Sequence, residues 1–218
     1  MWKWSLNWGQ VTPTIVIGTC PMTANDLKQI QAETGVTAVL SVQHDDCLQY
    51  WRIDYPTMRR AGIRLGMIMA RCPIRDFDIE DMRRRLPEAI TCLARLLDAG
   101  HKVYVHCTAG LGRSPLVTLG YLTLIKNHSP EDAIQRILKA RPDAVPAWEA
   151  YHGCCSDLLV RYRPAIERRA FELYQSGIHA DANTDWLVAQ AEIFHTELSK
   201  GCSHDGAQYH SIAPGCAE

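Results

Sequence analysis

The stretch from Val103 to Pro115 constrains the fold of this chain more than any other part of the sequence. Val103–His106 is mostly apolar and β-branched, as a buried strand should be. Gly110 and Gly112 allow the following residues to curl, and Pro115 suits the first turn of a helix, where its missing N–H costs nothing. The sequence therefore predicts a strand, a tight loop and a helix, with Cys107 placed where the strand ends.

A loop of this kind can bind a tetrahedral anion such as phosphate. Its backbone N–H groups point inward, and the helix that follows adds its positive N-terminal end. Arg113 adds a planar fork for two phosphate oxygens. The same positive field should lower the pKa of Cys107. The predicted phosphate-binding residues are Thr108, Ala109, Gly110, Leu111 and Gly112.

Cys107 is the candidate nucleophile, because a thiolate beside a bound phosphate can attack phosphorus in line. Ser114 can donate to the sulfur and help it to leave later, and His106 either positions the loop or tunes the thiolate. Two other interpretations are a buried structural cysteine beside a chance pair of glycines, and a sulfur-transfer loop of the rhodanese type. The sulfur-transfer loop would not usually need Arg113 and Ser114 at this spacing.

Strands and helices are expected to alternate along the chain. Further strands are predicted at residues 14–18, 36–42 and 63–68. Helix-start signals occur at Thr23, Ser129 and Pro146. Another helix is predicted from an apolar stripe formed by Met82, Leu86, Ile90, Leu93 and Leu97. Pro87 should kink this helix or start a new helical segment. This alternation predicts an α/β fold with a central, mainly parallel sheet flanked by helices. The anion-binding loop then lies at the carboxyl end of a central strand.

The chain is long enough for one α/β domain, residues 1–162, and a helical appendage, residues 163–199. The appendage is predicted as a helix from Pro164 that ends at Gly177, followed by a helix capped by Thr184. The inward residues of the second helix are predicted to be Trp186, Leu187, Ala191 and Phe194. These helices either pack on the first domain or bind a protein partner. Residues 200–218 are rich in Gly, Ser and Ala and are predicted to be disordered, and the irregular spacing of Cys202, His204, His210 and Cys216 favours a tail over a metal site.

Transfer of a phosphoryl group to a cysteine also requires an acid that protonates the leaving oxygen. The candidates, in or beside a polar loop predicted at residues 71–78, are Asp76, Asp78 and Asp81. Helix capping explains Asp78 and Asp81, so Asp76 is the preferred acid. Arg71 and Arg75 flank it, either to attract an anionic substrate or as ordinary surface charges.

The pattern Cys-x5-Arg-Ser, with His106 before it and Pro115 after it, resembles the signature of the protein tyrosine phosphatase superfamily in its dual-specificity branch. Within that branch, residues 107–113 are similar to the loop of the glucan phosphatases, the group that contains laforin and the plant starch-excess enzymes. Segments 75–78, 82–87 and 139–142 are also similar to the plant enzymes, and the match runs from about residue 11 to about residue 160.

This resemblance implies the dual-specificity phosphatase fold, with Asp76 as general acid and phosphorylated α-glucan as substrate. A phosphoprotein is the main alternative substrate, and a phospho-ligand-binding module with weak catalysis is the alternative of a different class. Phe77 would stack on a sugar ring, and Tyr50 and Trp51 fall near further glucan-contacting aromatic residues of those enzymes. Ser114 departs from the Ala-Pro of the plant members and keeps the general dual-specificity form. Residues 163–199 resemble a small helical domain of unknown function attached to many bacterial proteins.

Composition limits the other partners and cofactors. The net charge is −1 without a long basic run, so neither nucleic acid nor a membrane surface is expected as a partner. Nine cysteines without paired CxxC spacing argue against a disulfide framework or a zinc site, and no metal or cofactor is expected. A reducing compartment fits the thiolate chemistry. Because no signal-like leader or membrane-spanning run is recognised, a soluble, cytoplasmic protein is expected.

Two polar or aromatic clusters carry open interpretations. Trp2, Trp4 and Trp8 share one face if the chain is extended, which predicts an edge strand or a flap on the core, or else a surface for carbohydrate stacking. His44, Asp45 and Asp46 resemble metal ligands, but a loop after a strand is preferred.

Overall fold

The computed structural model of the chain describes residues 3–179 and 181–200. Trp2, the predicted tail from residue 201 and its Cys and His residues lie outside the described part. The described strands form one five-stranded sheet in the order β1-β2-β5-β3-β4. The strands are β1 (Trp8–Thr12), β2 (Ile15–Gly18), β3 (Ala38–Gln43), β4 (Ile68–Ile74) and β5 (Val103–His106). Only β1 pairs antiparallel, at one edge of the sheet, so the predicted mainly parallel α/β fold is confirmed.

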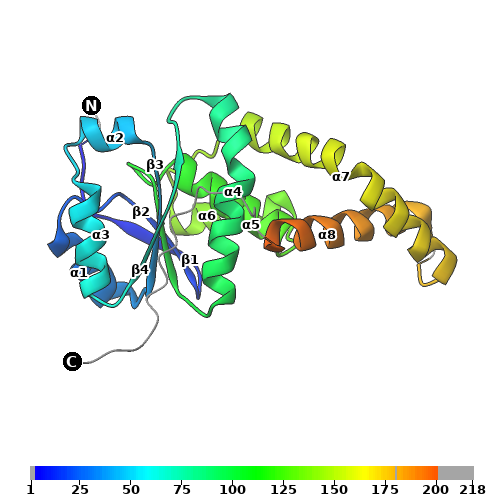
Figure 1. Ribbon diagram of the computed structural model, residues 1–218, viewed down its shortest axis with the longest axis horizontal. Coiled ribbons are helices and arrows are strands. Elements are labelled where there is room, and N and C mark those ends of the chain that lie inside the picture. The colour runs from blue at the N-terminus through cyan, green and yellow to red at the C-terminus, as the bar shows by residue number, and fades with distance from the viewer. Residues whose placement is uncertain (1–2, 180, 201–218) are drawn as a thin grey trace.

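Helices cover both faces of the sheet (Figure 1). The first helices along the chain are α1 (Ala24–Thr34), α2 (Asp45–Tyr50) and α3 (Tyr55–Arg64). They are followed by α4 (Ile79–Asp98), α5 (Arg113–Leu124) and α6 (Pro130–Ala140). The last described helices are α7 (Trp148–Ser176) and α8 (Ala182–Lys200), which project from the sheet as a hairpin in Figure 1. The predicted helix starts at Thr23 and Ser129 are confirmed, because each side chain accepts a hydrogen bond from the backbone N–H of the residue three positions later.

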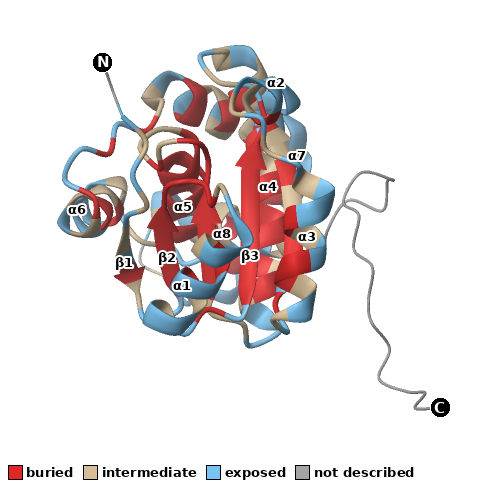
Figure 2. Cartoon of the chain, turned by 90° about the vertical axis from the view of Figure 1, so that its left-hand side faces the viewer, coloured by how far each residue is buried: buried red, intermediate tan, exposed pale blue. Residues whose placement is uncertain are grey.

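Alternate residues of the strands face two separate cores, which explains the near-continuous apolar runs. Val16, Val39 and Tyr104 pack in a smaller cluster with residues of α1 and α3. Ile17, Leu40 and Val105 face a larger cluster that contains residues of α4, α5, α7 and α8. The inner strands β2, β3 and β5 are buried at every residue (Figure 2).

The register of the parallel strands brings three chain segments to one edge of the sheet. Gly18 pairs with His106, and Ser41 also pairs with His106 on the other side of β5. The residues that follow β2, β3 and β5 therefore emerge together, around Cys107. This edge is where an α/β sheet places its ligands.

Two local predictions in the first half of the chain are wrong. The strand predicted at residues 63–68 is the end of α3 and a turn, and β4 runs over Ile68–Ile74 instead. The polar loop predicted from Arg71 is therefore confined to residues 75–78. The loop expected at His44 is a helix start, because the His44 ring accepts the Asp46 N–H and caps α2. Short apolar runs fit a strand and the last turn of a helix equally well, which explains the error at residues 63–68.

Several predictions about the helices are corrected as well. Pro87 does not start a new segment, since α4 is one helix. The two helices predicted from Pro146 and Pro164 form one helix, α7, which begins at Trp148. Gly177 caps its end, as expected. Val160, four residues before Pro164, is exposed, so water can bind the carbonyl that the proline leaves unpaired. The prediction that Thr184 caps the second helix of the appendage is also wrong. The Thr184 N–H donates to Asp181, and α8 starts at Ala182.

The C-terminal hairpin packs on the α/β layers through an apolar seam. Ile166 and Leu173 of α7 and Phe194 of α8 belong to the larger core cluster. Leu187, predicted to face inward, is 54% exposed. The domain boundary predicted after residue 162 falls inside α7, and the division into a domain and an appendage stays a prediction. None of the described helices is long and apolar enough to cross a bilayer.

Candidate active site

The loop that joins β5 to α5, residues 107–112, is named the Cys107 loop below. Cys107 is 2% exposed and begins the loop where β5 ends. The N–H groups of Gly110 and Ser114 donate to its sulfur, and the Ser114 hydroxyl lies 3.5 Å from the same atom. The strand, the loop and the helix predicted from the sequence are therefore all present, and they direct several donors at one sulfur.

These donors stabilise the ionised form of Cys107. Burial by itself raises the pKa of the Cys107 thiol, since it disfavours charge. The charge of Arg113, the Ser114 hydroxyl and the two N–H groups act in the opposite direction and outweigh burial, so the pKa lies below its ordinary value. The loop thus combines a nucleophile with the donors that would hold a phosphate.

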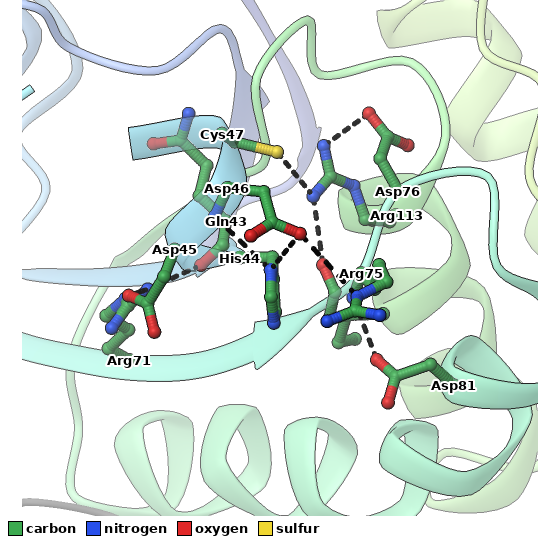
Figure 3. A network of polar contacts seen from close by, with 11 residues as sticks. Gln43, His44, Asp45, Asp46, Cys47, Arg71, Arg75, Asp76, Asp81 and Arg113 are labelled. Carbon is green, nitrogen blue, oxygen red and sulfur yellow. Dashed lines mark hydrogen bonds and ion pairs between the residues drawn. The ribbon is translucent and has the colours of Figure 1, made fainter. Parts of the chain in front are cut away.

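Arg113 is 1% exposed and lies between the Cys107 loop and β4. Its Nη1 donates to the Ile74 carbonyl oxygen at 2.9 Å, and its Nη2 donates to the Thr108 hydroxyl at 3.3 Å. Nη2 also lies 2.6 Å from a carboxylate oxygen of Asp76 (Figure 3). Nε is buried and has no hydrogen-bond partner among the described residues, so it remains available to an anion.

Residues 75–78, between β4 and α4, are named the Asp76 loop below. The Asp78 carboxylate accepts the Asp81 N–H and caps α4, which confirms the helix-capping explanation for Asp78. The Asp81 carboxylate accepts the Arg75 N–H at 2.8 Å and pairs with Arg84. Asp76 is the aspartate whose carboxylate meets Arg113 (Figure 3). Helix capping therefore holds for Asp78 alone, since the Asp81 carboxylate accepts the Arg75 N–H and does not cap α4. The choice of Asp76 as the acid stays a prediction.

The other predicted site residues surround this centre at different depths. His106 is buried, and its Nδ1–H donates to the Cys107 carbonyl oxygen, so it braces the start of the loop. Burial lowers the His106 pKa to about 4, which keeps the ring neutral near pH 7. Phe77 lies at the other extreme, 95% exposed and with a φ of 57°.

Helix α2 and the Asp76 loop meet through charged side chains. The Arg75 guanidinium lies 3.6 Å from Asp46, and the Arg71 guanidinium lies 2.6 Å from Asp45 (Figure 3). Trp51 ends α2 beside Tyr50, which is 79% exposed, and their ring centroids are 5.4 Å apart. The His44 ring accepts the Asp46 N–H and caps the helix, which gives it a structural role.

Three residues of the site lie outside the predicted set. Gln43, at the end of β3, donates to the Thr108 hydroxyl at 3.2 Å. Cys47 accepts a hydrogen bond from Arg113 at 3.3 Å, and Arg141 donates to the Ala109 carbonyl at 2.8 Å. The parallel sheet could have indicated Gln43, because β3 ends at the same edge as β5. The resemblance of segment 139–142 to the plant enzymes was a signal at Arg141 without a role attached to it, and nothing local in the sequence marks Cys47.

A cavity of about 380 Å³ adjoins the Cys107 loop. Ala109 and Leu111 of the loop form one side of it. The other lining residues include Asn7, Trp8, Arg141 and Asp143. Trp4, from the same N-terminal segment, donates its ring N–H to the Cys20 carbonyl. The segment before β2 thus belongs to the wall of the site, and Trp8 begins the edge strand β1, as predicted.

The fold and this site define a class of protein. Residues 20–152, more than half of the chain, match the family described as dual specificity phosphatase, catalytic domain. The chain therefore belongs to the dual-specificity phosphatases, and the predicted membership of that branch is confirmed.

Several members of this group are similar to the chain in sequence. An amyloplastic phosphoglucan phosphatase of Castanea sativa is 30% identical over 74% of this chain and 43% of its own length. Laforin of Mus musculus is 30% identical over 63% of the chain and 45% of its own length. A chloroplastic phosphoglucan phosphatase of Arabidopsis thaliana is 34% identical over 54% of the chain and 20% of its own length. The chain thus spans less than half the length of these relatives.

Solved structures agree on the fold alone. A human protein described as tyrosine phosphatase-like serine/threonine/tyrosine-interacting protein has a TM-score of 0.56 at 17% identity, over 71% of this chain and 97% of that chain. The crystal structure of PTPMT1 has a TM-score of 0.53 at 20% identity, over 67% of this chain and 90% of that chain. These matches confirm the predicted dual-specificity phosphatase fold.

Proposed function

We propose that this protein is a cysteine-dependent phosphatase that hydrolyses phosphate monoesters of α-glucan. The observation that carries the proposal is the Cys107 sulfur, buried at the centre of N–H and O–H donors beside the Arg113 guanidinium. This arrangement suits a thiolate that attacks a phosphorus atom held by the same donors.

The reaction has two steps. The Cys107 thiolate attacks phosphorus while the ester P–O bond breaks, and Asp76 gives its proton to the leaving alcohol oxygen. Water then attacks the phosphocysteine and loses a proton to Asp76, and the S–P bond breaks to return the thiolate. The Ser114 hydroxyl, 3.5 Å from the sulfur, stabilises the departing thiolate in this second step. Arg113 and the amides of the Cys107 loop hold the phosphoryl oxygens throughout.

Arg113 and Asp76 must also exchange partners during this cycle. Their side chains lie 2.6 Å apart, so Asp76 rests on the guanidinium that would hold the phosphate. A bound phosphate oxygen replaces that contact and leaves the Asp76 carboxyl, 34% exposed, beside the leaving group.

Three observations support glucan as the substrate. The relatives of the chain include phosphoglucan phosphatases and laforin. The residues that line the cavity beside the Cys107 loop include an aromatic residue, Trp8, and the polar residues Asn7 and Asp143, a composition that suits a sugar ring with its hydroxyls. The exposed Phe77 ring beside Asp76 offers a second stacking surface.

Turnover of an aryl phosphate by the full chain tests the chemistry. We expect steady release of phosphate and its complete loss in Cys107→Ser. An inactive wild-type chain that still binds phosphate would instead support the phospho-ligand-binding module. Phosphate release from phosphorylated amylopectin, compared with a phosphotyrosine peptide at equal phosphate concentration, tests the substrate. Faster release from the peptide would favour the phosphoprotein alternative.

The cellular location is part of the proposal too. A cytoplasmic location is supported by the thiolate mechanism, which requires a reducing environment. Two of the relatives are named as amyloplastic and chloroplastic proteins. Cell fractionation with an antibody against the full chain decides between these compartments, and recovery in an organelle fraction would contradict the cytoplasmic proposal.

The C-terminal hairpin is proposed as the surface for a protein partner. Affinity capture with the full chain, compared with a variant in which the exposed Tyr174 and Leu187 are replaced by serine, tests this. Equal capture by the two chains would contradict it.

A further inference from the structure

Arg141 contacts the Cys107 loop from outside the sequence motif. It follows the last residue of α6 and is 9% exposed. Its Nη2 donates to the Ala109 carbonyl oxygen at 2.8 Å, and its Nη1 donates to the Asn7 side-chain oxygen. A buried guanidinium is costly to desolvate, so its contact with a main-chain carbonyl of this loop calls for an explanation.

The Ala109 carbonyl and the Gly110 N–H belong to one peptide group. The group is planar and trans, so its C=O and N–H bonds point in opposite directions. The Gly110 N–H donates to the Cys107 sulfur. The carbonyl at the other end of the group accepts from Arg141. Arg141 and the sulfur are therefore connected through the two ends of a single peptide plane.

The orientation of this plane needs an external constraint. Gly110 has a φ of 70°, a conformation that glycine enters and leaves more easily than other residues. The loop is also tightly placed there, because a Cβ at Gly110 would lie 2.4 Å from the Gly18 carbonyl oxygen. A residue that holds the Ala109 carbonyl fixes which way the Gly110 N–H points.

We propose that Arg141 is a positioning residue that holds the Ala109–Gly110 peptide with its N–H directed at the Cys107 sulfur, and that this contact helps to keep the sulfur ionised. The proposal rests on the proposed function, because it assumes that Cys107 is the nucleophile. It goes beyond that function by assigning a role in thiolate formation to a residue 34 positions after the cysteine. A hydrogen bond from a charged donor also polarises the peptide group, which strengthens the bond at its other end.

Other ionisable groups face the same sulfur. Arg113 on α5, Cys20 after β2, Tyr104 on β5 and Arg141 itself interact electrostatically with Cys107. Arg141 therefore acts in two ways, through its charge and through the peptide group. Lysine at position 141 keeps the charge and a donor, whereas methionine removes both at similar length.

Alkylation of Cys107 by iodoacetamide between pH 4 and pH 10 tests the proposal without any substrate. The full chain is labelled briefly at each pH, and mass spectrometry quantifies the peptide that contains Cys107. We expect Arg141→Met to raise the midpoint of alkylation by about one pH unit, since a bond to a charged group contributes on the order of one pKa unit or more. Arg141→Lys should restore most of the shift. Arg136→Met, an exposed arginine of the same helix, is the matched control and should match the wild type.

The pH dependence of kcat/KM should show the same shift as the alkylation midpoint. The kcat/KM of Arg141→Met for an aryl phosphate should fall about tenfold below the thiol midpoint and approach the wild-type value above it. A defect of general folding would lower activity equally at every pH. Where Arg141→Met does not fold, as judged by circular dichroism, Arg141→Gln replaces it with the same expectation.

The outcomes are distinguishable. A wild-type midpoint equal to that of an ordinary thiol would contradict the proposed function itself. A low wild-type midpoint that stays unchanged in the folded Met or Gln variant would overturn the role of Arg141 alone. A shift of equal size in Arg136→Met would also overturn it.

Discussion

The Cys107 loop and the Asp76 loop both contact the Arg113 guanidinium, yet the protein holds them in different ways. Around the Cys107 loop the contacts are buried, and they come from β3, from α6 and from the residues after β2, through Gln43, Arg141 and Cys20. The Asp76 loop is held mainly by its own neighbours, through the Asp78 cap and the Asp81 carboxylate. Phe77 at its tip is almost fully exposed.

This difference matches what each loop must do in the proposed reaction. A nucleophile and its anion donors must be fixed before the substrate arrives, since ordering them during the reaction would raise the barrier. An acid that releases Arg113 to a phosphate and then meets the leaving group must change partners within each cycle. The comparison predicts that variants of the Cys107 loop alter the ionisation of sulfur, whereas variants of the Asp76 loop alter kcat or substrate affinity at constant sulfur pKa.

Asp76→Asn should have the largest effect among the variants that keep the nucleophile. We expect kcat on a sugar phosphate to fall about a hundredfold or more, because the amide cannot protonate an alkoxide leaving group. The loss should be smaller for an aryl phosphate, whose leaving group needs less protonation. Steady-state kinetics on both substrates measures this, and Glu80→Gln, an acid of the first turn of α4, is the control. Equal losses on both substrates would contradict the role of Asp76 as acid.

Ser114→Ala sharpens the comparison at the sulfur. The variant removes a donor that lowers the Cys107 pKa, so that pKa should rise toward its ordinary value. Less thiolate is then present on the acidic side of the profile, so the acidic limb of kcat/KM should move to higher pH by about one unit, with little change on the alkaline plateau. A pH profile of kcat/KM with an aryl phosphate checks this. An acidic limb at the wild-type position would show that the hydroxyl does not act on the sulfur.

Asp81→Asn tests how the Asp76 loop is held. The weaker acceptor should loosen the Arg75 N–H contact and misplace Asp76, which lowers kcat about fivefold while the alkylation midpoint of Cys107 stays constant. Arg84→Gln removes the other partner of Asp81 but leaves the loop contact, so its kcat should match the wild type. If Arg84→Gln lowers kcat as much as Asp81→Asn, the charge of the pair rather than the loop contact is responsible.

Phe77→Ala should have the smallest effect and only on one substrate. Loss of a stacking ring should raise KM for phosphorylated glucan roughly threefold, a typical cost for one aromatic contact. The kcat/KM for a small aryl phosphate should not change. Phe171→Ala, an exposed phenylalanine of α7, is the control. Unchanged glucan kinetics would count against sugar stacking by Phe77.

Local signals predicted much of the fold and the centre of the site. The Cys107 loop, its flanking strand and its helix follow from residues 103–115, because each requirement acts within a few residues. The helix starts at Thr23 and Ser129 follow for the same reason. The errors fall where one pattern supports two structures, as at residues 63–68, where an apolar run is the end of a helix.

The sequence alone determined the arrangement on which the proposed chemistry depends, since it places a cysteine, an arginine and a serine at fixed spacing after a strand. The tertiary structure decided what surrounds it. Gln43, Cys47 and Arg141 reach the site only because parallel strands end at one edge and α6 packs beside β1. Their contacts with the Cys107 loop could not be predicted from local patterns, because contacts between distant segments depend on packing and not on any local conformational preference.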